Sequence, residues 1–300
     1  MTTTSAPIPF TQKTDVLTVS GLCYGQPSGV HVYLMHGFPY DIACYQHVAP
    51  ALAAKGCFVV VPFLRGFGTT RFNNPVQMRS GEQSALGNDL LGLMDAFNTK
   101  KAVLAGFDWG GRAACVVAAL WPERAIGLVS GDGYNIQNIA ASGNPATPRQ
   151  EFQHWYQYYF HSERGRAGLS QNRKELCKLL WSLWSPLWGF SDEEFNETAP
   201  SFDNPDFVDV VIHSYRHRYA LVAGDPTLQH IDSALALQPK IVVPSIVLIG
   251  QNNGVVSPQP DAHIKNHFDH LVKLRKLPRI GHNLPQEAPA QFTEAVISLL

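Results

Sequence analysis

A carboxylate stands between two glycines, at the point where an apolar segment gives way to a helix-forming one. The segment reads Gly106-Phe107-Asp108-Trp109-Gly110, which keeps the glycines of a G-x-S-x-G turn and replaces its serine with an acid. In that strand–turn–helix arrangement a strained turn exposes the middle side chain above the end of the strand. An ionised carboxylate can act there as a covalent nucleophile, so we predict this role for Asp108.

Two further loops could complete the same site. The sequence His36-Gly37-Phe38-Pro39 closes an earlier apolar segment, and His282 follows the last one. The backbone N–H groups of Phe38 and of Trp109, directly after the nucleophile, would form an oxyanion hole. We expect His36 to lie among the substrate-binding residues, and His282 to supply the histidine in the chain order nucleophile, acid, histidine.

The elements that must position these groups alternate along the chain. Short apolar runs predict six buried strands, at residues 31–35, 58–61, 102–105, 126–129, 246–249 and 271–274. Between most of them lie segments of helical length; residues 80–97, for example, repeat leucines at three- and four-residue steps. This alternation predicts an α/β fold with a mostly parallel sheet and helices on both faces.

The alternation stops after residue 135. Residues 136–228 contain no convincing buried strand and predict helices rich in aromatic side chains, at 149–161, 164–184, 191–198 and 205–219. We interpret this segment as a helical cap, inserted between residues 1–135 and 229–300 of one sheet domain.

These motifs together resemble the α/β-hydrolase superfamily over nearly the whole chain. Within it, the aspartate at position 108 resembles the branch that contains epoxide hydrolases, haloalkane dehalogenases and fluoroacetate dehalogenases. The resemblance implies an α/β-hydrolase fold with a mostly parallel eight-stranded sheet and an inserted cap. It also implies cofactor-free hydrolysis, in which Asp108 forms an alkyl ester with the substrate and His282 activates the water that cleaves it.

The cap segment carries the residues that distinguish these branches. Trp155-Tyr156-Gln157-Tyr158-Tyr159-Phe160 resembles the Y-Q-x-Y-F of epoxide hydrolases, and Tyr215-Arg216 resembles their second tyrosine segment. The resemblance implies that Tyr156 and Tyr215 hydrogen-bond the epoxide oxygen. Packing among the many cap aromatics is the competing interpretation of both tyrosines.

Fluoroacetate dehalogenases share other features with this chain. Arg112 resembles the second of their two carboxylate-binding arginines, while the first position holds Trp109. His154-Trp155 resembles their halide-pocket pair. We therefore place Arg112, His154 and Trp155 among the substrate-binding residues, and the substrate is either an apolar or aromatic epoxide or one that carries a carboxylate.

The third triad member departs from the commonest pattern. Many relatives take an acid from the loop after the strand at 246–249, where this chain has Asn253. An amide carries no charge to stabilise an imidazolium. Some haloalkane dehalogenases take the acid from the end of the strand after the nucleophile helix, where this chain has Asp132. We predict that Asp132 orients His282, with Asn253 as an auxiliary acceptor; a simple turn role for Asp132 is the alternative.

Composition limits the partners. With 23 basic and 24 acidic residues and a net charge of -1, the chain has no excess of charge to attract nucleic acid or an anionic membrane. Five scattered cysteines argue against disulfides and zinc, and no histidine group has recognised metal spacing, so we expect no metal. Without an apolar leader or span, a cytoplasmic enzyme for a small molecule is predicted. Its oligomeric state is open, with a homodimer as one option.

Three functions are consistent with these residues. We favour an epoxide hydrolase that forms vicinal diols. A hydrolytic dehalogenase for haloacids or haloalkanes would use the same nucleophile and would be distinguished by halide release. A non-catalytic ligand receptor on the same scaffold would lack turnover altogether, since fold does not dictate function.

Overall fold

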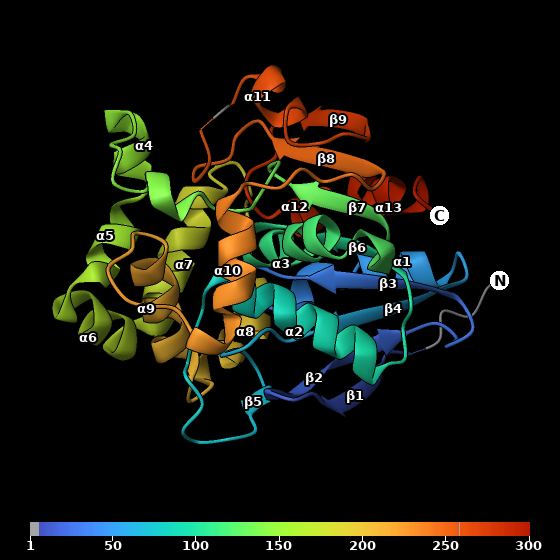
Figure 1. Ribbon diagram of the computed structural model, residues 1–300, viewed down its shortest axis with the longest axis horizontal. Helices are drawn as coiled ribbons and strands as arrows, with labels where there is room; N and C mark the ends of the chain where they lie inside the picture. The colour runs from blue at the N-terminus through green and yellow to red at the C-terminus, as the bar shows by residue number, and fades with distance from the viewer. Residues whose placement is uncertain (1–5, 258) are drawn as a thin grey trace.

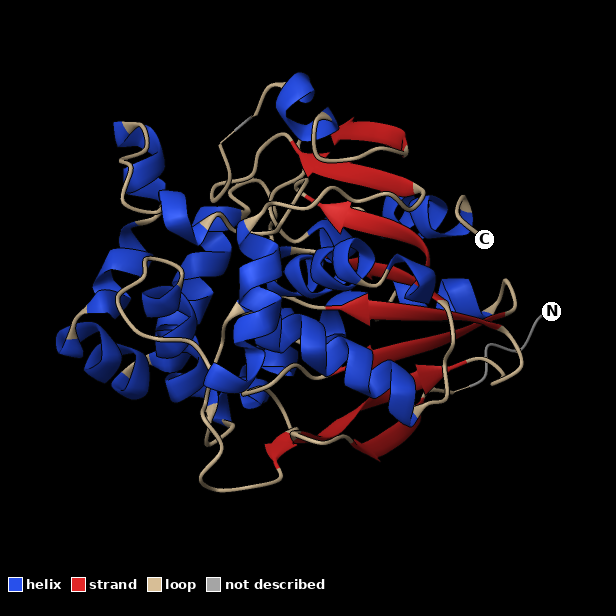
Figure 2. Ribbon diagram, viewed as in Figure 1, coloured by secondary structure: helices blue, strands red, loops and turns tan. Residues whose placement is uncertain are grey.

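The computed structural model describes residues 6–257 and 259–300 (Figure 1). One twisted sheet runs through the molecule with helices on both faces, and further helices lie beyond one end of its strands (Figure 2). The predicted α/β architecture is confirmed. Residues 1–5, which carry most of the N-terminal segment that we interpreted as free of a leader, lie outside the described residues.

The sheet has nine strands in the order β1-β2-β4-β3-β6-β7-β8-β9, with the short β5 paired to β2. The strands from β4 to β9 in this order run parallel, whereas β1 and β2 are antiparallel to their neighbours. The strands are β1 (Ile8–Lys13), β2 (Leu17–Tyr24), β3 (Val30–Met35), β4 (Cys57–Pro62), β5 (Arg71–Phe72), β6 (Ala102–Gly106), β7 (Ala125–Gly131), β8 (Ser245–Gly250) and β9 (Leu271–Leu277).

All six predicted strands are present, and the main path contains the eight strands that the fold class implies. The apolar runs predict neither β1 nor β2, nor the two-residue strand β5. Strand β1 lies at the edge with all of its side chains exposed or half-buried, and β2 includes serine, threonine and glycine. Neither has the continuous apolar run that identifies a strand buried on both faces.

Helices cover both faces of the sheet. Helices α2 (Gln83–Ala96) and α3 (Asp108–Leu120) pack on each other over one face, while α1 (Val48–Ala53) and α13 (Pro289–Ile297) pack on each other over the opposite face (Figure 1). The predicted leucine stripe of α2 is buried at Leu86, Leu90 and Leu93. The smaller helices of this part are α10 (Gln229–Ala236), α11 (Asp261–Lys265) and α12 (Leu284–Glu287). None of the helices in the described ranges combines the length and apolarity needed to cross a bilayer.

The remaining helices form an insertion between β7 and β8, which lies beyond the carboxyl ends of the parallel strands (Figure 1). Two of the helices predicted here, at 149–161 and 164–184, are each divided, at His154 and at Asn172, whose backbone angles depart from the helical region. The helices of the insertion are α4 (Pro148–Gln153), α5 (Trp155–His161), α6 (Glu163–Gln171), α7 (Arg173–Trp184), α8 (Asp192–Thr198) and α9 (Phe207–His217). Short 3-10 turns punctuate the chain at η1 (Ile42–Tyr45), η2 (Pro122–Arg124), η3 (Ile139–Ala141), η4 (Ala199–Asp203) and η5 (Pro226–Leu228).

Candidate active site

Asp108 begins a helix directly above the sheet. Strand β6 ends at Gly106 and α3 starts at Asp108, whose φ of 50° lies in the left-handed region that few non-glycine residues adopt. A Cβ on Gly110 would overlap the backbone oxygen of Met35, so glycine lets the helix start this close to the neighbouring strand. The turn thus has the backbone strain that often accompanies functional positions.

The loop after β3 holds one oxygen of this carboxylate. The backbone N–H of Phe38 donates to Asp108 Oδ1 at 2.9 Å. A Cβ on Gly37 would lie only 2.5 Å from that of Asp108, so glycine permits the close approach of the loop. The N–H of Trp109 lies in the first turn of α3, where backbone amides have no acceptor within the helix. Of the two N–H groups expected to form the oxyanion hole, that of Phe38 contacts the carboxylate, and that of Trp109 belongs to the next residue along the chain.

The second oxygen faces His282, which lies in the loop between β9 and α12. His282 Nε2 is 3.6 Å from Asp108 Oδ2, and its Nδ1 is 3.2 Å from Asp132 Oδ2. Asp132 directly follows β7 and has a φ of 64°. The structure thus brings the three residues of the predicted triad together from three separate segments, and all three side chains are almost completely buried.

Asn253 has a different role from the auxiliary acceptor that we predicted. Its side-chain oxygen accepts from the backbone N–H groups of Val255 and Val256, at 2.8 and 3.1 Å. These two donors direct the amide nitrogen toward Asp132 Oδ2, to which it donates at 2.8 Å. The same nitrogen lies 3.0 Å from His282 Nδ1. The amide oxygen, the only acceptor of the Asn253 side chain, is thus already bonded to Val255 and Val256. Asn253 therefore acts as a donor that holds Asp132 in place.

Mutual interactions set the charge of the pair. Burial alone would raise the pKa of Asp108, but the hydrogen bond and charge of His282, the charge of Arg112 and the Phe38 N–H outweigh burial and lower it. Burial alone would lower the pKa of His282, but Asp108 and Asp132 outweigh burial and raise it to about 9. These shifts favour a carboxylate on Asp108 and an imidazolium on His282 in the resting pair.

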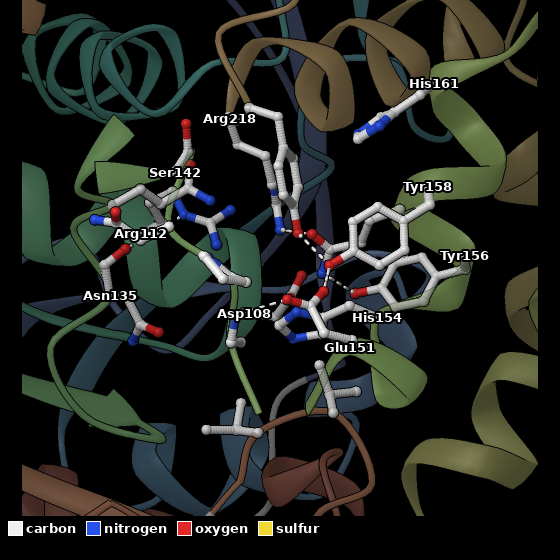
Figure 3. Close-up of a pocket in the computed structure, with 18 of the residues that line it drawn as sticks. Asp108, Arg112, Asn135, Ser142, Glu151, His154, Tyr156, Tyr158, His161 and Arg218 are labelled. Carbon is white, nitrogen blue, oxygen red and sulfur yellow. Dashed lines mark hydrogen bonds between the residues drawn. The ribbon is translucent and has the colours of Figure 1, made fainter. Parts of the chain in front are cut away.

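A cavity of about 720 Å³ opens between this edge of the sheet and the insertion (Figure 3). It reaches the three triad residues and the side chains of Arg112, His154 and Tyr156, which the sequence analysis singled out. Burial lowers the pKa of His154 to about 4, assisted by the charge of Arg218, so this imidazole is neutral. Its Nε2 lies 2.7 Å from the side-chain nitrogen of Gln150.

The two predicted cap tyrosines lie together beside the cavity. Tyr156 lines it, whereas Tyr215 is fully buried behind, with the two ring centroids 5.3 Å apart. Tyr156 Oη accepts a hydrogen bond from Gln157 at 2.9 Å, while Tyr215 Oη has no partner among the described residues. Burial raises the pKa of both phenols, so both are neutral proton donors at physiological pH.

Two predicted substrate-binding residues lie outside the cavity lining. His36 is fully buried, its Nδ1 donates to the Gly37 carbonyl at 3.0 Å, and its Nε2 accepts from the Leu64 N–H at 3.1 Å. Both ring nitrogens are thus used to fix the loop, and burial lowers the pKa of His36 to about 4. Trp155 packs its ring against Tyr156 and Tyr159. These two residues support the site and do not line it.

Arg218 lines the cavity and is not among the residues that the sequence motifs indicate. Its guanidinium carbon lies 4.3 Å from the centroid of the Tyr215 ring, within cation–π range. The signal was present, because Arg218 follows Tyr215 by three residues and α9 continues to His217. Arg216, the arginine of the matched Tyr215-Arg216 segment, instead pairs with the exposed Glu163.

One group in the described ranges has the composition of a cation site, namely Glu82, His217 and Asp232, whose ligand atoms lie within 4.8 Å of one another. His217 Nε2 is 3.2 Å from Glu82 Oε2, which is an ordinary ion-pair or hydrogen-bond distance. The group belongs to α9, α10 and the start of α2, and none of its members lines the cavity that contains Asp108.

Comparison with known proteins identifies the family. Residues 30–289 match the model of the alpha/beta hydrolase fold family. A crystal structure from Klebsiella pneumoniae, provisionally assigned as an epoxide hydrolase, superposes with a TM-score of 0.94 at 44% identity and covers 98% of this chain and 96% of that one. The chain belongs to the alpha/beta hydrolase fold family.

Curated relatives point the same way. Epoxide hydrolase B of Mycobacterium tuberculosis is 32% identical over 151 residues, which are 46% of this chain and 41% of that protein. The matched segment thus spans less than half of that relative's length. The AB hydrolase superfamily protein YfhM of Bacillus subtilis is 25% identical over 294 residues, 96% of each chain. The resemblance to epoxide hydrolases that the sequence motifs indicated is confirmed.

Proposed function

We propose that this protein is an epoxide hydrolase that opens its substrate to a vicinal diol through an ester on Asp108. One observation carries the proposal: an ionised, hydrogen-bonded carboxylate and a buried phenol, Tyr156, line the same cavity. An epoxide needs both a nucleophile for a ring carbon and a proton donor for the departing oxygen.

In the first step, Asp108 Oδ2 attacks a ring carbon, and the bond between that carbon and the epoxide oxygen breaks. The oxygen takes a proton from Tyr156, with Tyr215 as the second donor. The products of this step are a hydroxyalkyl ester and a phenolate. Because the pKa values of both phenols are raised, the proton is present when the alkoxide develops.

Formation of the ester also prepares the base. The interactions with Asp108 that raise the pKa of His282 require a charged carboxylate, and an ester has no charge. The pKa of His282 therefore falls after the first step, and its proton can return to the phenolate. The neutral Nε2 can then accept a proton from water, while Asp132 keeps the ring oriented and stabilises the new imidazolium.

The second step attacks the ester carbonyl and restores the enzyme. Hydroxide adds to the Asp108 side-chain carbonyl carbon, and the resulting oxyanion lies where the N–H groups of Phe38 and Trp109 can donate to it. Collapse breaks the ester bond and leaves Asp108 as a carboxylic acid, while the departing diol oxygen takes its proton from His282. The Asp108 carboxyl then gives its proton to the neutral imidazole, which restores the resting carboxylate and imidazolium. The sum is one epoxide and one water converted to one diol.

The insertion supports this reaction as a cap. We propose that residues 136–228 act as a cap over residues 1–135 and 229–300, because the tyrosines come from the insertion and the triad does not. Arg112 and His154 are proposed to contact the substrate. Three further points stay predictions: a cytoplasmic location, the lack of a nucleic-acid partner, and assembly as a homodimer.

A hydrolytic dehalogenase would use the same nucleophile, but the cavity favours the epoxide. Two residues resemble a halide pocket. Trp155 does not line the cavity, and His154 does line it but is neutral. The two buried phenols have no task in displacing a halide, whereas an epoxide requires their protons.

Isotope labelling tests the proposal. Repeated turnover of styrene oxide in H₂¹⁸O should place the label in the Asp108 carboxylate, because water attacks the ester carbonyl. A panel of epoxides and haloacids is scored in parallel for diol and for halide. Label in the diol from its first appearance, with none in the protein, would exclude the ester, and halide release without any diol would exclude the epoxide.

A further inference from the structure

Two guanidinium groups face the cavity without an acidic hydrogen-bond partner in the part of the chain that the structure describes. Arg112 is only 7% exposed, and its one hydrogen bond in the described ranges runs from Nε to the Asn135 carbonyl at 3.3 Å. Arg218 donates from Nη1 to Gln157 Oε1 at 3.5 Å, while its Nε and Nη2 are buried without a hydrogen-bond partner among the described residues. Figure 3 shows both arginines beside the same pocket as Asp108.

A second buried arginine shows what a purely structural role looks like in this fold. Arg65 is 2% exposed, and it grips Asp89 through two bonds of 2.6 Å, from Nε and from Nη2. Its third nitrogen donates to the Ser80 carbonyl at 2.8 Å. Burying a guanidinium is costly unless an anion and hydrogen bonds compensate it. Arg112 and Arg218 lack that compensation within the described residues.

The two arginines also repel each other. Burial and then the charge of Arg218 lower the pKa of Arg112 to about 10, so Arg112 remains cationic at neutral pH. The negative groups that line the cavity are Asp108, Asp132 and Glu151. Asp108 and Asp132 are shared with the imidazolium of His282, and Glu151 is bonded by the Tyr158 hydroxyl and by the Ala146 N–H at 2.6 Å.

The reaction increases the uncompensated positive charge in the cavity. When Asp108 becomes an ester it loses its charge, so the carboxylate that raises the pKa of Arg112 disappears during each turnover. An anionic group on the bound substrate would restore the balance in both the resting complex and the ester. The planar fork of a guanidinium matches a carboxylate in shape, and two such groups can grip one carboxylate from two sides.

We infer that the cavity selects an epoxide that carries a carboxylate, held by Arg112 from α3 and Arg218 from the end of the insertion helix α9. This inference rests on the proposed epoxide hydrolysis and adds its substrate class. Arg218 is the specificity residue, because it lies over the ring of Tyr215 and so places the anion next to the proton donors. The two arginines come from the sheet domain and the insertion, so the substrate would bridge these parts.

The test compares two substrates of one shape, 3-phenylglycidate and the neutral 3-phenylglycidamide. We expect the wild-type protein to favour the acid in kcat/KM, and Arg218→Met to raise KM for the acid on the order of 10- to 100-fold while leaving the amide unchanged. Arg112→Met should act in the same direction. Arg164→Met removes a charge from an exposed position on α6 and is the matched control, expected to change neither substrate.

Three results would overturn the inference. The amide could be opened as efficiently as the acid by the wild-type protein. Arg218→Met could lower kcat equally for both substrates, which would make it a positioning residue for Tyr215. Added acetate could bring the amide to the rate of the acid, which would show that a separate anion fills the site.

Inhibition and a neutral epoxide separate this inference from the proposed function. Cinnamate should compete with substrate better than cinnamamide, and Arg218→Met should remove the difference. Equal inhibition by the two would contradict the inference. Diol formation from styrene oxide without any preference for the acid would overturn only the substrate class. No diol from styrene oxide, 3-phenylglycidate or 3-phenylglycidamide would overturn the proposed function as well.

Discussion

The two sides of the cavity differ in how their polar groups are satisfied. On the sheet side, Asp108 accepts from a backbone N–H, and Asp132 accepts from Asn253 and faces His282. On the insertion side, the Tyr215 hydroxyl and two nitrogens of Arg218 are buried without partners in the described ranges. Asp132 Oδ1 and His282 Nε2 on the sheet side also lack hydrogen-bond partners in the described ranges, but both residues are held by other contacts of the triad. The sheet side is therefore largely preorganised, whereas the insertion side keeps hydrogen-bond donors that a ligand could use.

This contrast assigns different work to the two sides. Groups whose hydrogen bonds are already made keep their geometry throughout the reaction, as a nucleophile and a general base must. Groups that lack partners gain interactions when substrate arrives, and so they contribute to selection and to protonation of the leaving oxygen. Variants on the sheet side should therefore abolish turnover, and variants on the insertion side should change which substrates react and how fast.

The largest effect is expected from Asp108→Ala. Removing the nucleophile should lower turnover by roughly four orders of magnitude or more, because no ester can form. Diol formation from an epoxide gives the measurement. Asp95→Ala, which removes an exposed carboxylate paired with Arg124, is the control and should retain activity. A normal rate for the Asp108 variant would mean that water attacks the substrate directly.

Asp132→Asn should have the next largest effect. It removes the charge that stabilises the imidazolium, and a comparable change in a serine protease costs about four orders of magnitude in kcat. Ester formation should survive while its hydrolysis slows, so rapid-quench kinetics should show a burst of ester followed by slow diol release. Asn253→Ala, which only loosens Asp132, should have a smaller effect. A larger loss of activity in Asn253→Ala than in Asp132→Asn would assign the role of the acid to the loop after β8.

The tyrosines are expected to rank third. Tyr156→Phe and Tyr215→Phe should each slow epoxide opening by about 10²- to 10⁴-fold, the usual contribution of a general acid. No ester burst should appear, because the loss falls on the first step. Tyr134→Phe removes a hydroxyl that donates to the Pro239 carbonyl away from the triad, and it should stay close to the wild type. Unchanged rates in a variant that carries both Tyr156→Phe and Tyr215→Phe would show that the two phenols only pack.

The smallest effect concerns stability. The pKa of His282 is raised from 6.5 to about 9 in the folded protein, so its interactions contribute fully below pH 6.5. That contribution is lost as the pH rises through about 9, because the folded protein then loses the extra proton. In urea titrations the free energy of unfolding should decline over this window, and less steeply in Asp108→Ala. Parallel curves would indicate that the two residues do not interact.

The sequence predicted the sheet side of the site better than the insertion side. Asp108, Asp132 and His282 follow apolar strands, and the carboxyl ends of neighbouring parallel strands meet at one edge, so their proximity followed from the alternation of elements. The position of His36 was harder to predict, because a histidine beside such a loop can point into the cavity or fix the backbone, and here it fixes the backbone.

The insertion has no such repeating geometry. Its helices pack through aromatic side chains in an order that their spacing does not specify. The sequence therefore does not show that Tyr156 lines the cavity while its neighbour Trp155 packs against other rings. Arg218 was missed because it lies beyond the matched Tyr215-Arg216 pair. The role of Asn253 required the positions of the Val255 and Val256 N–H groups, which only the folded loop provides.

The central claim is that Asp108 becomes covalently bonded to substrate carbon in every turnover. Intact-protein and peptide mass spectrometry of Asp132→Asn, quenched in acid during reaction with an epoxide that the wild type opens, tests it most directly. The account predicts an added mass equal to that of the whole epoxide, located on the peptide that contains Asp108. If this variant turns over slowly and yet never carries an adduct on that side chain, the account is contradicted.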